Sequence, residues 1–188
     1  MDKRVLENTV LALLKAAPGL GSIHVNKGLL MIDAYYYSLF HRTLTGIQYV
    51  KDKYGPVPEP EARNIIKNME LDTIEVQKEE KGPHKKKSHV ALVKPDYSVF
   101  PPEALAIINE VAERITSMSA QSLSEATHNK AWEYTEQGEI IPITSTYSLE
   151  VIDRSTRELT TSEQKEIHDI LEEMYTGGTS GIQPVCAG

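Results

Sequence analysis

The stretch Tyr54-Gly55-Pro56-Val57-Pro58 organises the middle of the chain. Glycine adopts backbone angles that other residues avoid and proline fixes φ, so Gly55-Pro56 predicts a tight turn. The ring of Tyr54 can cover this turn. Val57-Pro58 then starts the next helix at a fixed angle, because proline is favoured in the first turn of a helix. We therefore expect a rigid corner in front of a helix over residues 58–69.

Two helices are expected before this corner. Residues 2–16 carry apolar side chains at helical spacing, and Ala17-Pro18-Gly19 ends that pattern. A second helix is expected from about Asn26, a candidate N-cap, to about Arg42. Its side chains are apolar on most sides, which is typical of a buried helix. Residues 45–49 are a candidate short strand.

Beyond the corner, apolar residues first alternate with polar ones, as in a strand, and later recur at helical spacing. Residues 73–78 and 88–93 alternate around the basic loop Lys81-Gly82-Pro83-His84, which predicts a hairpin. Further helices are expected over 102–116, 121–127 and 129–136, and capping boxes at Thr160 and Thr161 start a last one. The order predicts an α+β, mainly α-helical fold: a compact helical domain with one β-hairpin inserted after the third helix.

We expect a single domain over residues 1–176, followed by a disordered tail over 177–188. The chain has 188 residues and a formal net charge of −7, so it repels nucleic acid overall. Cys186 is the sole cysteine, which excludes a disulfide framework and a zinc site built from cysteines. The N-terminus lacks the features of a signal peptide, and no stretch is apolar enough to span a membrane. We expect a cytoplasmic protein without a membrane partner.

No catalytic, metal or cofactor motif stands out. The six histidines form neither H-x-x-x-H nor H-E-x-x-H, and the phosphate-binding and nucleophile-elbow patterns are absent from the sequence. We therefore expect no catalytic residues, no metal and no cofactor. Asp33 lies within the most apolar helix, so it should cap a nearby backbone or pair with Lys27 or Arg42. His128 and Trp132 should share one face of a helix, as architecture rather than chemistry.

A set of short motifs resembles the Panacea domain, also called SocA-like and associated with phages. The motifs are Lys27-x-Leu29-Leu30-x-x-Asp33, Thr45-Gly46, Tyr49-Val50-x-x-x-Tyr54-Gly55-Pro56-Val57-Pro58, Ser119-Ala120-x-x-Leu123-Ser124-x-x-Thr127-His128-x-x-x-Trp132 and Gly138-Glu139-x-Ile141. The match covers roughly residues 25–143, with helical extensions on both sides. The family-motif residues, interpreted as structural rather than functional, are Lys27, Asp33, Tyr54, Gly55, Pro56, Val57, Thr127, His128 and Trp132.

The resemblance implies an antitoxin that neutralises, by direct binding, a toxin encoded by the adjacent gene. It implies toxin partners of diverse folds, with one branch of the family delivering its toxin to a protease. The family has no established catalytic residues, so the resemblance implies a non-enzymatic protein that acts by protein binding.

Two other hypotheses stay open. Three helices followed by a hairpin is also the order of a winged-helix DNA-binding regulator, which would bind its own promoter DNA. In that interpretation Lys81, Lys85, Lys86 and Lys87 at the hairpin tip contact nucleic acid. The recognition helix would then be 58–69, where the cations stand beside three glutamates, a poor arrangement for a DNA groove. The remaining hypothesis is a phage-encoded host-interaction protein.

Overall fold

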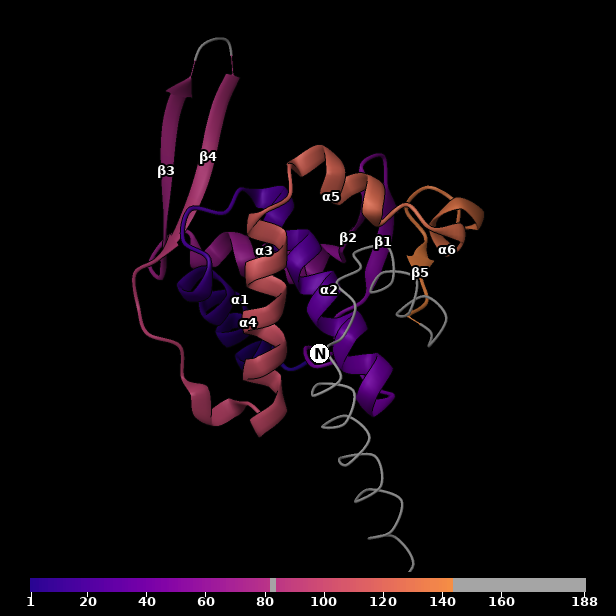
Figure 1. The fold of residues 1–188 in the computed structure, drawn as a ribbon, viewed down its shortest axis with the longest axis horizontal. Helices are drawn as coiled ribbons and strands as arrows, with labels where there is room; N and C mark the ends of the chain where they lie inside the picture. The colour runs from indigo at the N-terminus through magenta and orange to yellow at the C-terminus, as the bar shows by residue number, and fades with distance from the viewer. Residues whose placement is uncertain (82–83, 144–188) are drawn as a thin grey trace, which may run out of the picture. The chain divides into compact units, whose positions relative to one another are not determined.

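A computed structural model describes residues 1–81 and 84–143; the side chains of residues 79–86 lie outside this description. The expected helix after Thr160, the domain boundary at 176 and the tail over 177–188 fall outside the described residues and stay predictions. The described part is α+β and mainly helical (Figure 1), as the sequence predicts. None of its helices combines the length and the apolar character that crossing a bilayer requires.

Helices α1 (Lys3–Ala16) and α2 (Ser22–Phe40) begin the fold. Asp2 caps α1, because its carboxylate accepts hydrogen bonds from the backbone N–H groups of Arg4 at 2.9 Å and Val5 at 3.3 Å. The expected cap of α2 at Asn26 is wrong. The helix already begins at Ser22, after Gly21, because Val25 N–H reaches back to the Gly21 carbonyl at 3.0 Å.

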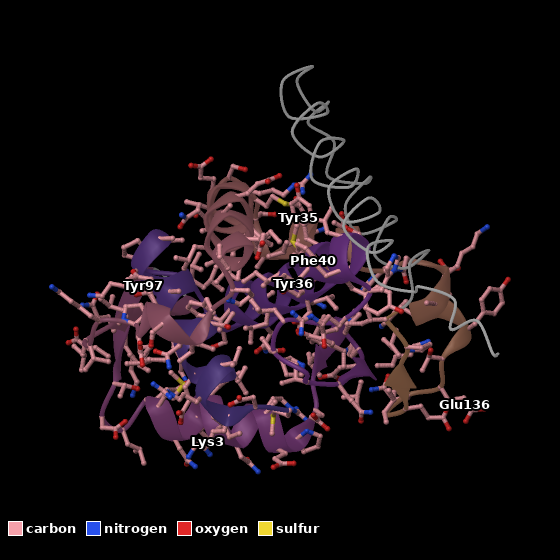
Figure 2. The ribbon with its side chains drawn as sticks, turned by 90° about the horizontal axis from the view of Figure 1, so that it is seen from below. Lys3, Tyr35, Tyr36, Phe40, Tyr97 and Glu136 are labelled. Carbon is pink, nitrogen blue, oxygen red and sulfur yellow. The ribbon has the colours of Figure 1, made fainter. Side chains whose placement is uncertain are left out.

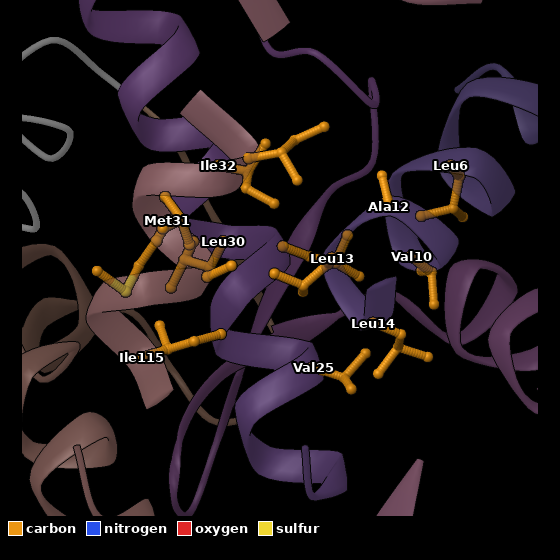
Figure 3. Packing of buried hydrophobic residues seen from close by; sticks show 14 of the residues in the cluster. Leu6, Val10, Ala12, Leu13, Leu14, Val25, Leu30, Met31, Ile32 and Ile115 are labelled. Carbon is orange, nitrogen blue, oxygen red and sulfur yellow. The ribbon is translucent and has the colours of Figure 1, made fainter. Parts of the chain in front are cut away.

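The core lies where α1, α2 and α4 (Pro102–Thr116) pack against one another (Figure 3). Gly28 permits α1 and α4 to approach α2 closely. A Cβ atom at this position would lie 2.8 Å from Leu13 Cδ2 of α1 and 3.0 Å from Ile115 Cδ1 of α4. The three helices therefore interlock at a point where one of them has no side chain.

The C-terminal half of α2 is aromatic (Figure 2). Tyr36 is buried and its ring centroid lies 4.5 Å from that of Phe40. The hydroxyl of Tyr36 accepts a hydrogen bond from Arg42 at 3.3 Å. The helix ends at Phe40 and is followed by His41 at a φ of 53°, two residues before the predicted end.

A three-stranded sheet follows α2; the sequence predicted only one short strand here, over residues 45–49, whereas the observed strand begins at Tyr49. Strands β1 (Tyr49–Asp52) and β2 (Gly55–Pro58) form an antiparallel hairpin, and β5 (Ile140–Ile141) pairs with the other edge of β1. The expected corner before a helix is therefore corrected: residues 55–58 are a strand. Its prolines are compatible with this position because an edge strand can lack ladder N–H groups.

Helix α3 (Pro60–Met69) leads into a hairpin of β3 (Ile74–Lys81) and β4 (His84–Ala91), as predicted. The hairpin reaches away from the helices (Figure 1). Its base is held by Leu20, whose carbonyl accepts the backbone N–H of His89 at 2.9 Å. The chain then passes through a 3₁₀ turn (Tyr97–Val99), α4, α5 (Ala120–Ala126) and α6 (Lys130–Tyr134), close to the predicted helical ranges.

Gly28→Ala should destabilise the fold despite alanine's better helix propensity. Overpacking costs about 1–3 kcal/mol, against a gain of about 1 kcal/mol for replacing glycine within a helix. In a Leu13→Ala background the obstructing Cδ2 atom is gone, so the same substitution should cost less. Urea unfolding of the two single variants and the double variant measures this coupling. Strict additivity would show that α1 and α2 do not interlock at Gly28.

Candidate functional site

Asp33 lies at the centre of a buried hydrogen-bond network. Its side chain is 0% exposed. It accepts hydrogen bonds from the Thr45 N–H at 2.9 Å, the Thr45 hydroxyl at 2.5 Å and the Tyr49 hydroxyl at 2.8 Å. Burial raises the pKa of Asp33 to about 6, although these hydrogen bonds oppose the rise. Of the two predicted roles, binding to a nearby backbone is confirmed, whereas Lys27 and Arg42 donate to other acceptors.

Lys27 is buried as deeply as the apolar side chains around it. It is 2% exposed, and its Nζ donates a hydrogen bond to the carbonyl of Pro56 at 2.8 Å. Burial lowers the pKa of Lys27 to about 7, and the Asp52 carboxylate opposes the shift. Such an amine can in principle act as a nucleophile. Here it is closed off from solvent and bonded to a carbonyl, so its geometry is that of a positioning group.

Gly55 is the point at which the separate motifs meet. Its φ is +92°, which disfavours any residue with a side chain. A Cβ atom there would lie 2.4 Å from Lys27 Nζ, 2.9 Å from Thr127 Oγ1 and 3.0 Å from His128 Cδ2. The backbone of β2 therefore touches side chains from α2 and from the α5–α6 connection. We call this contact, formed by Lys27, Gly55, Pro56, Thr127 and His128, the motif joint.

His128 and Trp132 stack, so their predicted proximity is confirmed, but they do not share one helix, because His128 lies in the connection before α6 (Lys130–Tyr134). Their ring centroids lie 4.0 Å apart and the planes differ by 9°. Lys51 Nζ of β1 lies 4.4 Å from the Trp132 ring centroid, and Trp132 Nε1 donates to the Asp52 carbonyl at 3.2 Å. Burial and the Lys27 ammonium lower the pKa of His128. The stack thus attaches α6 to the β1–β2 hairpin.

Three residues of this region were missed by the sequence reasoning: Lys51, Asp52 and Asn129. Asn129 is fully buried and caps α6, accepting the Trp132 N–H at 3.0 Å. An asparagine directly before a helical pattern was the available signal for the cap. The roles of Lys51 and Asp52 depend on strand pairing and had no local signal.

The side chains of Tyr54 and Val57 take little part in the motif joint. The expectation that the Tyr54 ring covers the turn is wrong, because Tyr54 is 63% exposed and Lys53 Nζ lies 5.3 Å from its ring centroid. Its side chain projects from the β1–β2 turn into solvent. Val57 is half-buried in β2.

The predicted nucleic-acid contacts are only partly described. Lys87 is exposed on β4, whereas the side chains of Lys81, Lys85 and Lys86 lie outside the described part. The strand register sets Glu79 opposite Lys86 and Glu80 opposite Lys85. A helix-turn-helix joins its two helices by a short turn, but residues 41–59, including the β1–β2 hairpin, separate α2 from α3. The observed topology gives the winged-helix hypothesis no support, and it stays a prediction.

Among the described residues, no three His, Cys, Asp or Glu side chains gather as metal ligands would. The contacts of the motif joint hold backbone in place; they keep its amine buried and its imidazole half-buried. The arrangement therefore supports a scaffold role for the motif residues.

Comparison with known proteins connects the chain to a family. The sequence model of the family described as antitoxin SocA-like, Panacea domain matches residues 25–133, which is more than half of the chain. No curated protein matches the chain, and no solved structure matches it.

Gly55→Ala should destabilise the protein by about 2 kcal/mol or more, through backbone strain and steric overlap together. Gly138→Ala is the matched control, because Gly138 has a φ of +84° and a Cβ atom added there would meet nothing within 4 Å. That control should lose only the stability that backbone strain costs, about 1–2 kcal/mol, because no steric overlap is added. Chemical denaturation compares the two, and equal losses would contradict a tight contact at Gly55.

The buried Lys27 should make stability depend on pH. Its pKa is about 7 in the folded protein against an ordinary 10.5, so between these values the unfolded chain binds more protons. Stability contributed by this group therefore rises with pH across this window, by up to about 1.4 kcal/mol per pH unit. The rise should be absent in Lys27→Met.

The control for this measurement is Lys15→Met. Lys15 also donates to a backbone carbonyl, that of Ala91 at 3.2 Å, but its side chain is exposed. Urea unfolding from pH 7 to pH 10 should show the wild-type slope in Lys15→Met and a flatter one in Lys27→Met. Parallel profiles for Lys27→Met and wild type would refute the assignment.

Proposed function

Because the chain belongs to the antitoxin SocA-like, Panacea domain family, we propose that it is the antitoxin of a toxin–antitoxin pair. It neutralises the product of the adjacent gene by binding it directly, in the cytoplasm and without catalysis. The family match over residues 25–133 is the observation that carries the proposal.

The geometry of the motif residues supports binding over catalysis. Lys27, Asp33 and His128 are motif groups whose side chains could in principle act in catalysis, and all three are engaged in contacts within the protein. An enzyme needs its reactive groups within reach of a substrate. A scaffold whose potentially reactive motif residues are held in contacts within the protein instead presents its other surfaces to a partner.

Neutralisation by binding predicts a fixed stoichiometry. Purified toxin activity should fall in proportion to added antitoxin and reach its minimum at a constant molar ratio, because each chain occupies its partner. Co-expression should rescue growth, and the two proteins should co-elute in size-exclusion chromatography. If one chain inactivated many toxin molecules, the proposal of a non-enzymatic antitoxin would be wrong.

A further inference from the structure

A groove lies between α3 and β4, with α1 and α2 beneath it. Its volume is about 290 Å³. The floor is apolar, formed by Val10, Leu14, Val25, Ile66 and Ile74. This volume lies just below the range of about 300–1,000 Å³ that is typical of small-molecule sites, and it is large enough to hold an apolar side chain. We call it the α3–β4 groove.

The rim of the α3–β4 groove is cationic. Arg63 and Lys67 stand one helical turn apart on α3, and Lys87 lies on β4; all three are exposed. Glu70 is the sole acid among the described residues that line the groove, and its Oε1 lies 3.3 Å from His89 Nε2. In a chain of net charge −7 the groove is therefore a local region of opposite sign.

One wall of the groove, β4, is anchored to the α1–α2 connection by backbone hydrogen bonds. The His89 carbonyl accepts the Gly19 N–H at 3.0 Å, and the His89 N–H donates to the Leu20 carbonyl at 2.9 Å. The ring Nδ1 of His89 also lies 2.9 Å from that carbonyl. Lys87 is two residues from this anchored position, so part of the rim is held in place before any partner arrives, which lowers the ordering cost of binding.

We propose that the α3–β4 groove binds an acidic segment of the partner protein. An apolar side chain of that segment enters the floor, and its carboxylates face Arg63, Lys67 and Lys87. Protein interfaces combine a buried apolar anchor with a charged rim in this way, and the rim charges speed association. The inference rests on the proposed function, since the partner is the toxin.

The chemistry of the groove favours a protein over DNA. A phosphate backbone offers charge but no apolar side chain, so it would leave the floor unused. An acidic peptide uses both parts of the groove, because it brings an apolar side chain and a negative charge together.

The test compares two triple variants with equal loss of charge. The first variant removes the three positive charges of the rim by combining Arg63→Gln, Lys67→Gln and Lys87→Gln. The control combines Lys53→Gln, Lys94→Gln and Lys130→Gln, three exposed lysines that do not line the groove. Calorimetry with the adjacent gene's product should give at least a tenfold weaker Kd for the rim variant and less than a twofold change for the control. The wild-type affinity should fall with added NaCl, and the rim variant should show a flatter salt dependence.

Each other outcome is informative. Unchanged affinity of the rim variant would overturn the inference and leave the antitoxin function standing, as would an equal loss in both variants. No complex with the wild-type chain would refute the proposed function, and the inference with it. A rim variant that binds the toxin normally but fails to shift its own upstream DNA would make the groove a nucleic-acid site instead.

Discussion

The hydrogen bond from the buried Lys27 ammonium to the Pro56 carbonyl is the contact on which the middle of the fold depends. Removing a charged amine from water is costly, so the position is tolerated only where a carbonyl and a nearby carboxylate offset the loss. Gly55 makes this possible, because any side chain there would occupy the space of Lys27 Nζ. The lysine and the glycine therefore have to be understood as one feature.

Helix α2 holds the β1–β2 hairpin at both strands through two buried ionisable groups. Asp33 binds Tyr49 at the start of β1, and Lys27 binds Pro56 in β2. Both groups sit on the same helix, so the hairpin's placement on α2 is specified by polar contacts as well as by packing. The α5–α6 connection then covers Gly55 from another direction. Motifs that are far apart in sequence thus describe one structural unit.

The motif joint and the α3–β4 groove differ in how exposed their polar residues are. In the motif joint, Lys27 and Thr127 are buried and donate to backbone carbonyls, which makes them good markers of the scaffold. At the groove, Arg63, Lys67 and Lys87 are exposed around an apolar floor, and none of them belongs to a family motif. The residues that mark the scaffold and the residues proposed to bind the partner are therefore separate sets, and specificity would depend on the exposed charge and shape of the groove.

The sequence by itself determined the fold class, most helix positions, the β3–β4 hairpin and the pairing of His128 with Trp132, because these follow from periodicity and local spacing. It did not determine that residues 55–58 form a strand. Their local turn chemistry suits a helix start as well as an edge strand, and pairing with β1 decides between them. Only the tertiary structure brought Lys27 to Pro56 and placed Arg63 and Lys87 around one groove. Such arrangements join residues distant in the chain, so no local pattern encodes them.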